Sequence, residues 1–488
     1  MKNKNIVLLL IFLFVIFSSF QANDLVSINE EKDLENTNKI SAILEKIVQK
    51  VLKISGGFVE KFTQNNNKIN EINNNIGKNP RLFQGDVVLS SQEGEEILNQ
   101  VVENVENAGI DVSEIIGETE RRKKRKMSGN MTLAWEFPIP YIVENEVNDT
   151  LVMIALKLIE LETCITFKRE YALVPNKAGL RFFKGTGCYS YIGRKFLDIF
   201  QDVSIGEGCE TIGTIQHETM HALGVYHEQA RADRDKYLQI FLNNVEKGNE
   251  FNFLKVEPNS SFIYNTKYDY GSAMQYPSTA FSMNNSVTML PIKPHYNKTL
   301  GVNSGMTFVD VKLLNNHYCK NNCSKKITCE NKGYQSPINC SRCICPDGYF
   351  GDYCTELPQK KPSCGDPVIE ITKRKKYLYT AGSGNCIHHL NTTSDKKLKI
   401  TFTFLNYYPG YEGRCKLENS LEVKYLKDKT VTGALFCLTD NATIISRNNH
   451  VIVHHRSTQT NNGATLVIES IEDSSTTSGV LKPIMVRL

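Results

Sequence analysis

A short motif with three histidines constrains this chain more than any other feature. His217 and His221 are four residues apart, so on a helix they project from one face, where two imidazoles can bind one zinc ion. Glu218 lies beside the pair, where a carboxylate can take a proton from a metal-bound water. Gly224 accepts the left-handed conformation that ends a helix, so the chain can turn back and deliver His227 as a third ligand. The spacing predicts a zinc centre that leaves a position open to water, unlike a structural site with four protein ligands.

The residues around this motif resemble those of one peptidase family. His217–His227 follows the H-E-x-x-H-x-x-G-x-x-H pattern of the metzincins, and His227–Asp235 resembles the astacin signature. Tyr268–Pro277 is similar to the methionine-containing turn of the astacins. The resemblance extends over nearly the whole chain from Asp86 onward. It implies a zinc endopeptidase with one catalytic ion, and a mixed α/β (α+β) metzincin catalytic domain.

The resemblance also implies roles for the residues near the ion. The three histidines would hold it, and Glu218 would act as the general base toward a zinc-activated water. Tyr276 is expected to bind zinc at rest and then to swing away and stabilise the developing oxyanion. Met274 would form an apolar floor under the metal, and Glu228 would pair with the new N-terminus left when a pro-segment is removed.

Length, charge and cysteine distribution indicate a secreted protein of several domains. At 488 residues the chain is too long for one ordinary core, and a net charge of +4 does not suggest nucleic acid as a partner. Fourteen cysteines, the first of them Cys164, argue for an oxidising compartment. Ile6–Phe17 is an apolar run after a basic start and is too short to span a membrane. We expect a signal peptide cut near Ala22, no membrane span, and an extracellular protein.

Glycosylation sequons fit secretion. The candidate acceptors are Asn130, Asn148, Asn259, Asn284, Asn297, Asn391 and Asn441. Asn322 and Asn339 also begin sequons, but the middle residue is a cysteine and we do not expect modification there.

The cysteine-free part of the chain is expected to be a helical pro-segment. Apolar residues at helical spacing predict helices over 40–52 and 97–105. An Asn-rich stretch over 65–79, between the two helices, is expected to be a loop. Between them, Phe83–Asp86 resembles the F-x-G-D motif of astacin pro-segments, although alone it is more often an ordinary turn. The resemblance implies that Asp86 binds the zinc, displaces the catalytic water and keeps the zymogen silent.

A run of six basic residues, Arg121–Lys126, follows this segment. Such a run is usually solvated, but here it divides the helical segment from the catalytic part. We interpret 122–125 as a site for a furin-type processing protease, with cleavage after Arg125 or, following trimming, after Lys126. The rival hypothesis is a matrix-binding protein with an inert peptidase scaffold, and a complete pro-segment argues against it because a dead enzyme needs no latency.

The catalytic part alternates short strands and helices. Trp135–Glu144 is expected to be the first strand, placed at a sheet edge by Pro138 and Pro140. Further strands are expected near 165–167 and 180–183, and the zinc helix from about 210 to 223. Leu151, Ile154, Ala155, Leu158 and Ile159 fall at helical spacing and predict a helix after the first strand.

The C-terminal third resembles two small extracellular modules. Cys345–Cys354 is similar to the end of an EGF-like module, and alternating strands after Cys364 resemble a CUB β-sandwich. With the catalytic part, the resemblance implies these disulfides: Cys164–Cys319, Cys188–Cys209, Cys323–Cys340, Cys329–Cys343, Cys345–Cys354, Cys364–Cys386 and Cys415–Cys437. Two histidine pairs, His388–His389 and His454–His455, are interpreted as surface residues because neighbours on a strand face opposite ways.

The expected architecture is multidomain. Its parts are a signal peptide (1–22), a pro-segment (23–125), an astacin-like peptidase domain (126–319), an EGF-like domain (320–355) and an all-β CUB domain (364–488). This order resembles that of nematode astacins. It implies extracellular protein substrates such as matrix or cuticle, with the CUB and EGF-like modules binding matrix proteins.

Overall fold

The computed structural model describes residues 31–51, 82–116, 134–256, 262–372, 374–410 and 413–473. The predicted signal peptide, the Asn-rich loop, the processing site at Arg125, Asn130 and Asn259 lie outside these residues. The chain divides into two compact units. The first comprises Met1–Thr266, Ala273–Ile292 and Leu313–Asn322, and the second Lys267–Ser272, Lys293–Lys312 and Cys323–Leu488. No helix among the described residues is long and apolar enough to cross a membrane.

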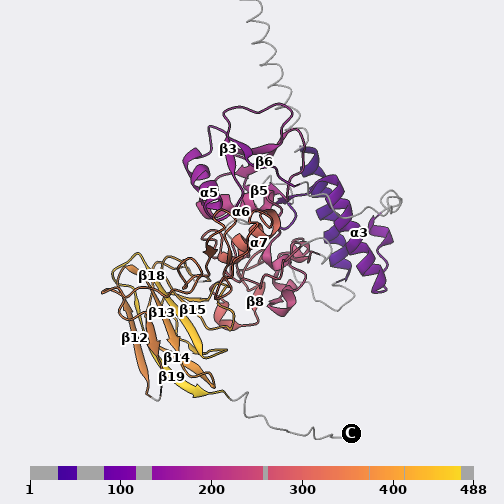
Figure 1. Ribbon diagram of the computed structural model, residues 1–488. Coiled ribbons are helices and arrows are strands. Elements are labelled where there is room, and N and C mark those ends of the chain that lie inside the picture. The colour runs from indigo at the N-terminus through magenta and orange to yellow at the C-terminus, as the bar shows by residue number, and fades with distance from the viewer. Residues whose placement is uncertain are drawn as a thin grey trace, which may run out of the picture. The chain divides into compact units, whose positions relative to one another are not determined.

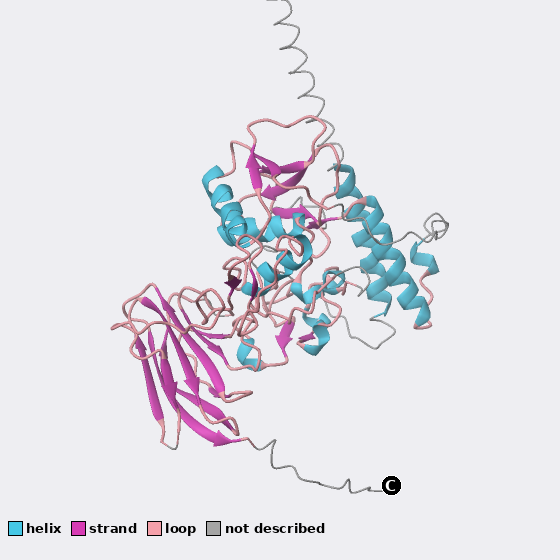
Figure 2. Ribbon diagram, viewed as in Figure 1, coloured by secondary structure: helices cyan, strands magenta, loops and turns pink. Residues whose placement is uncertain are grey.

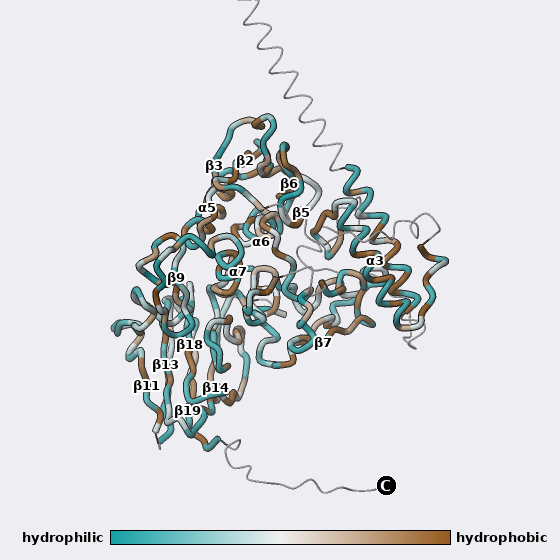
Figure 3. Tube along the Cα trace, turned by 45° about the vertical axis from the view of Figure 1, so that its right-hand side comes forward, coloured by the Kyte–Doolittle hydropathy of each residue, from teal (hydrophilic) through white to brown (hydrophobic). Residues whose placement is uncertain are grey.

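Two long helices of the first unit lie side by side (Figure 1). Residues 31–51 are helical, and α3 spans Ser91–Asn107. The side chain of Ser90 accepts a hydrogen bond from Glu93 N, and the Glu93 side chain accepts one from Ser90 N, so a capping box begins α3. Ile40, Leu44 and Ile47 share a buried cluster with Leu98 and Val102. Helix α3 confirms the second predicted helix; it carries both polar and apolar residues, as Figure 3 shows, and buries Gly94, Leu98 and Val102.

The central sheet of the first unit has six strands in the order β1-β5-β6-β4-β2-β3. The strands are β1 (Val87–Val88), β2 (Ile139–Val143), β3 (Phe167–Arg169), β4 (Gly179–Phe183), β5 (Cys188–Tyr191) and β6 (Phe200–Ile205). Strand β5 is antiparallel to β6, and the other pairs are parallel. The two residues of β1 follow Asp86 directly, so the predicted pro-segment supplies an edge strand of this sheet.

The prediction that the first strand lies at a sheet edge is wrong. Strand β2 pairs with β3 on one side and β4 on the other. Pro140 is tolerated there because pairing with β4 begins only at Tyr141, opposite Leu180, so its missing N–H removes no bond to that strand. The strand is also shorter than expected, since residues 134–138 precede it without strand structure.

Helix α5 (Asp149–Glu162) confirms the helix predicted after the first strand. Its buried residues are Val152, Ala155, Leu156 and Ile159. Two of the residues that predicted this helix, Ile154 and Leu158, are 38% and 41% exposed. The helix carries apolar residues around most of its circumference, so periodicity could not select the face that packs.

The remaining elements of the peptidase part are two helices, α6 and α7, and several short strands and 3₁₀ helices. These are α6 (Ile212–Ala222), α7 (Phe308–Tyr318), β7 (Leu238–Ile240), β8 (Met289–Pro291), and the 3₁₀ helices Glu228–Ala230, Arg234–Lys236, Leu242–Asn244, Glu250–Phe253 and Pro294–Tyr296. Residues 113–116 are also helical. Strands β7 and β8 form a separate antiparallel pair.

The second unit contains a β-sandwich, drawn as magenta strands in Figure 2. One sheet has the order β11-β13-β18-β15-β16 and the other β12-β19-β14-β17. The strands are β11 (Val368–Glu370), β12 (Lys376–Ala381), β13 (Gly384–Asn391), β14 (Lys396–Asn406), β15 (Ser420–Lys424), β16 (Ala434–Phe436), β17 (Thr443–Ile445), β18 (His450–Ser457) and β19 (Gly463–Glu472). A small hairpin of β9 (Tyr334–Gln335) and β10 (Cys343–Ile344) precedes the sandwich.

Seven disulfides join the cysteines in the pairs that the resemblance implies. They are Cys164–Cys319, Cys188–Cys209, Cys323–Cys340, Cys329–Cys343, Cys345–Cys354, Cys364–Cys386 and Cys415–Cys437. Three of these bonds fall within Cys323–Cys354, a segment too small to build a core of its own.

The two histidine pairs of the sandwich are buried, so their interpretation as surface residues is wrong. His388, His389, His454 and His455 are between 1% and 6% exposed. Strands β13 and β18 lie inside their sheet, and both faces are covered. The ring of His389 bonds to Gly348 O on one face, and that of His455 bonds to Tyr407 on the other. Alternation assigned opposite faces correctly but gave no information on what covers each face.

Candidate metal centre

Helix α6 positions two of the three histidines. Thr211 caps its first turn by accepting a hydrogen bond from Thr214 N at 3.1 Å. At the other end, Gly224 has a φ of +94°, and Val225 N donates to Met220 O at 2.9 Å. Gly224 N also donates to His221 O at 2.7 Å, which completes a Schellman-type end. This left-handed turn reverses the chain and brings His227 back toward the helix, as the sequence predicts.

The three histidines and Asp86 meet at one buried point. The Nε2 atoms of His217 and His227 are 3.3 Å apart and lie 3.1 Å and 3.2 Å from Asp86 Oδ2. His221 Nε2 lies 3.5 Å from Asp86 Oδ1. All four residues are at most 3% exposed. The structure therefore brings together the three candidate ligands and the candidate pro-segment ligand.

The other ring nitrogen of each histidine also has a partner. His217 Nδ1 lies 2.8 Å from Ala273 O, and His221 Nδ1 lies 2.8 Å from Val225 O. His227 Nδ1 lies 3.0 Å from Gln84 Oε1. Because each of these partners is an acceptor oxygen, the proton of each neutral imidazole belongs on Nδ1. The lone pairs on Nε2 are then directed at the shared point.

This donor set fits a zinc ion. Among the described residues, His221 Nε2 and Asp86 Oδ1 are buried atoms without a hydrogen-bond partner, which is unfavourable unless something else binds them. Three imidazoles and one carboxylate, with ligand atoms within 4.8 Å of one another, are a set that zinc accepts.

The protonation states at the centre suit metal binding. Burial lowers the pKa of His221 and lowers that of His227 to about 4, so these rings are neutral near pH 7. Burial by itself would raise the pKa of Asp86, but His227, His217 and His221 together hold it well below its usual value. Neutral imidazoles and an ionised carboxylate are the forms that bind a metal.

Glu218 and Tyr276 lie at the same centre with their polar ends unengaged. Among the described residues, neither carboxylate oxygen of Glu218 nor the hydroxyl of Tyr276 has a hydrogen-bond partner, and both side chains are buried. The ring of Tyr276 lies 4.4 Å from that of His227, centroid to centroid. Burial, and then the charge of Asp86, raise the pKa of Glu218 well above its usual value. For Tyr276 burial is the largest cause of a raised pKa, followed by Asp86 and Glu218.

The turn around Met274 supports the centre through its backbone. Met274 is 1% exposed, and its carbonyl accepts a hydrogen bond from Glu228 N at 2.9 Å. The preceding carbonyl, that of Ala273, is the partner of His217. Sequence reasoning assigned this turn only an apolar floor and missed the backbone carbonyl that orients a ligand.

The end of α6 is held by residues that no motif indicated. Trp135 Nε1 donates to Ala222 O at 2.8 Å, and Tyr318 Oη donates to Leu223 O at 2.8 Å. Gly193 N donates to His221 O at 2.7 Å. A single tryptophan in 488 residues was the one available signal for Trp135, because a buried indole N–H requires an acceptor.

The predicted glycosylation sites differ in exposure, and Glu228 has a partner of its own. Of the sequon asparagines in the described part, Asn148, Asn284, Asn297 and Asn441 are exposed and Asn391 is half-buried. The carboxylate of Glu228 accepts a hydrogen bond from Arg231 Nη1 at 3.1 Å. Its predicted partner, the new N-terminus, lies outside the described residues.

A buried three-histidine centre beside a glutamate is the arrangement expected of a zinc peptidase. Residues 127–319 match the family model described as Astacin, a peptidase family. Zinc metalloproteinase nas-34 of Caenorhabditis elegans is 34% identical over 384 residues, which cover 77% of this chain and 62% of that protein. Zinc metalloproteinase nas-23 of C. elegans is 31% identical over 412 residues, which cover 80% of this chain and 72% of that protein.

Among solved structures, high choriolytic enzyme 1, a hatching enzyme zinc-protease from Oryzias latipes, is 33% identical. The match covers 40% of this chain and 98% of that one, with a TM-score of 0.35. The chain thus belongs to the astacin family of zinc metalloproteinases. Zinc is the cofactor that the family membership and the donor set both indicate.

Proposed function

We propose that this chain is a secreted zinc endopeptidase, made as a latent zymogen, that cleaves extracellular proteins such as matrix or cuticle components. The observation that carries the proposal is the convergence of His217, His221 and His227 on one buried point beside Glu218. The named relatives, nematode zinc metalloproteinases, support the reaction class. The substrate class rests on analogy with that family.

The residues of the centre can divide the work of peptide hydrolysis. When bound, zinc supplies Lewis acidity toward the scissile carbonyl and makes water a better nucleophile. The Glu218 carboxylate takes a proton from the attacking water and passes it to the nitrogen of the leaving amine as the C–N bond breaks. The Tyr276 hydroxyl donates a hydrogen bond to the oxyanion that develops on the carbonyl oxygen. These roles agree with two buried side chains whose polar atoms have no partner among the described residues.

Latency follows from the position of Asp86. Its carboxylate lies 3.1 Å from His217 Nε2 and 3.2 Å from His227 Nε2, so it would be a fourth ligand of a bound ion and would keep a catalytic water away. Strand β1, which follows it, is paired with β5 and keeps the pro-segment in place. Cleavage after Arg125 by a furin-type protease would release both. The β-sandwich and the disulfide-bonded module before it would serve in binding matrix proteins.

A quenched-peptide assay on processed protein tests the proposal. Glu218→Ala should lower kcat/KM by about 10²- to 10⁴-fold while zinc content stays at one ion per chain. Glu207→Ala, a change at an exposed glutamate of the same domain, is the matched control and should leave turnover unchanged. Equal turnover in the wild type and Glu218→Ala would remove the assigned role of Glu218. No turnover by zinc-loaded wild type on any polypeptide would favour the inert-scaffold alternative.

A further inference from the structure

The three histidines of the centre differ in where their outer hydrogen-bond partners come from. His217 and His221 are oriented by the backbone carbonyls of Ala273 and Val225, both in the peptidase part. His227 is oriented by the side chain of Gln84, which belongs to the predicted pro-segment. The oxygen of Gln84 lies 3.0 Å from His227 Nδ1, within normal hydrogen-bond distance. One ligand of the site therefore depends on a residue that maturation removes.

Gln84 is built into this position. Its side chain is 0% exposed, and its φ of +50° is uncommon for a residue other than glycine. A tight turn holds it, because Phe83 N donates to Val87 O and Val87 N donates to Phe83 O, each at 3.0 Å. Gly85, with a φ of +82°, completes the turn. An unfavourable backbone conformation that persists at a buried side chain indicates that the surrounding contacts enforce it.

We propose that Gln84 is a second latency residue, which positions His227 from its outer side while Asp86 occupies the ligand side. This inference rests on the zinc site of the proposed function. By accepting the Nδ1–H of His227, Gln84 keeps the proton off Nε2 and fixes the plane of the ring, as an outer partner of a metal-bound histidine does. The same short turn thus contacts the centre twice, through residues 84 and 86.

A consequence is that zymogen and mature enzyme should hold zinc differently. Removal of the pro-segment takes away one ligand, Asp86, and the acceptor that orients another, His227. Loss of an outer partner of a metal ligand typically lowers metal affinity by about 10- to 100-fold. The zymogen should therefore release zinc more slowly than the mature form, and part of the difference should depend on Gln84.

The test compares zinc release from purified, zinc-loaded, full-length zymogens. Gln84→Met keeps the length of the side chain but has no oxygen acceptor, whereas Gln84→Glu keeps an acceptor at the same place. Each zymogen is mixed with an excess of a colorimetric zinc chelator and the release rate is measured. We expect Gln84→Met to release zinc about 10- to 100-fold faster than the wild type, and Gln84→Glu to be restored toward the wild-type rate. A thermal melt that matches the wild type shows that each variant is folded.

Maturation supplies an internal control. Residue 84 lies upstream of Arg125, so wild type and Gln84→Met give the same mature chain after processing, and their release rates should become equal. Equal rates from the two zymogens would overturn the role of Gln84, and so would a difference that persists after processing. If Gln84→Met fails to fold, Gln84→Glu alone decides, because zinc release from this zymogen about 10-fold or more faster than from the wild type would overturn the proposal. A wild-type zymogen that binds no zinc would instead refute the proposed function.

Discussion

The carboxylate of Glu228 is held by the guanidinium of Arg231, with Oε1 and Nη1 3.1 Å apart. Arg231 in turn donates to both carboxylate oxygens of Asp233, at 3.0 Å and 3.1 Å, and to Thr266 O at 3.2 Å. Arg231 is thereby fixed by several acceptors and presents Glu228 in a defined orientation next to the ligand His227. An ammonium group that arrives at Glu228 after processing would meet a preoriented carboxylate.

We predict that the new N-terminus stabilises the mature enzyme through Glu228. Acetylation of the terminal amine of the processed chain should lower the thermal midpoint by about 2–4 °C, which corresponds to about 1 kcal/mol for a domain of this size. In a Glu228→Gln background acetylation should change nothing, because the charge pair is already absent. The measurement is calorimetry of acetylated and free forms. The same drop in both backgrounds would mean that the N-terminus acts elsewhere.

We predict that Tyr276→Phe lowers kcat and leaves KM nearly unchanged. The hydroxyl is buried without a hydrogen-bond partner among the described residues, which suits a group that donates to the oxyanion when it forms. Loss of one such donor typically lowers kcat by about 10²- to 10³-fold. Steady-state kinetics on processed protein with equal zinc content measure the effect. A raised KM with unchanged kcat would assign the hydroxyl to substrate binding instead.

We predict that Asp86→Ala makes the uncleaved chain active. The carboxylate lies within 3.5 Å of all three Nε2 atoms, and removing it opens the position that it fills. The background should be Arg125→Ala, so that the furin-type cut cannot contribute. Turnover of a quenched peptide should then appear in the double variant Asp86→Ala, Arg125→Ala and be absent in Arg125→Ala alone. Silence in both would show that β1 and the helices, rather than the carboxylate, block the site.

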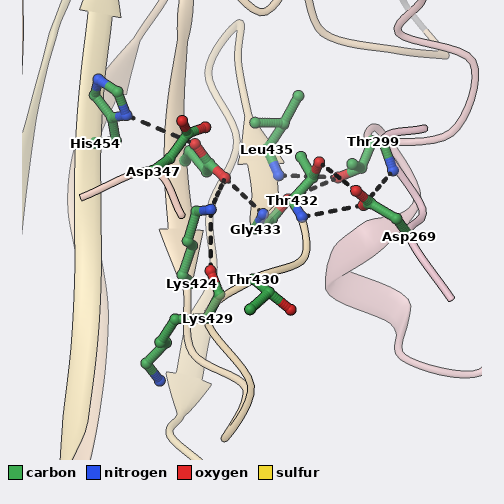
Figure 4. A network of polar contacts seen from close by, with 12 residues as sticks. Asp269, Thr299, Asp347, Lys424, Lys429, Thr430, Thr432, Gly433, Leu435 and His454 are labelled. Carbon is green, nitrogen blue, oxygen red and sulfur yellow. Dashed lines mark hydrogen bonds and ion pairs between the residues drawn. The ribbon is translucent and has the colours of Figure 1, made fainter. Parts of the chain in front are cut away.

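We predict that the stability of the second unit falls as pH rises from about 4 to about 6. Figure 4 shows Asp269 against Thr432, whose N and Oγ1 lie 3.0 Å and 3.1 Å from its carboxylate oxygens. Burial, and then the charge of Asp310, raise the pKa of Asp269 from 3.8 to about 6. The folded state therefore binds this proton more tightly than the unfolded state, and that stabilisation, on the order of 3 kcal/mol, is lost as the carboxyl ionises.

Asp269→Asn provides the control for this pH dependence. The amide cannot ionise, so the slope of the thermal midpoint between pH 4 and pH 6 should flatten relative to wild type. Thr432→Val should steepen it, because the lost hydroxyl donor stabilises the charged carboxylate. An unchanged slope in Asp269→Asn would assign the effect to another group.

Helix positions were easier to predict than the faces that helices bury. In the predicted pro-segment, apolar residues at helical spacing predicted both helices, and most of these residues are buried in, or pack against, one cluster. The same spacing predicted helix α5, but it did not indicate which residues are buried, since Ile154 and Leu158 are partly exposed. In the same way, Pro140 predicted a sheet edge, but β2 lies between two strands. Pairing with β4 begins only at Tyr141, so the missing N–H of Pro140 removes no hydrogen bond to β4.

The metal ligands could be predicted because their geometry is local. The four-residue step from His217 to His221, and a glycine turn before His227, are requirements within one helix and its end, so spacing in the chain reports them directly. The groups that bond to the ligands and to the end of α6 could not be predicted this way. Ala273 O, Trp135 and Gln84 are 56, 87 and 143 residues away in the chain from the groups they bond. Many residues of the same types occur at other separations, and only folding selects among them.

The amino-acid sequence was therefore sufficient to predict the zinc-site helix, the glycine turn, the three histidine ligands and the family. Backbone preferences and side-chain spacing act over a few residues, so they can be read from the sequence. Folding alone decided that Gln84 bonds to His227, that β2 is flanked on both sides, and that four sandwich histidines are buried. These outcomes depend on which distant surfaces pack together. That choice minimises the free energy of the whole chain and is not encoded at any one position.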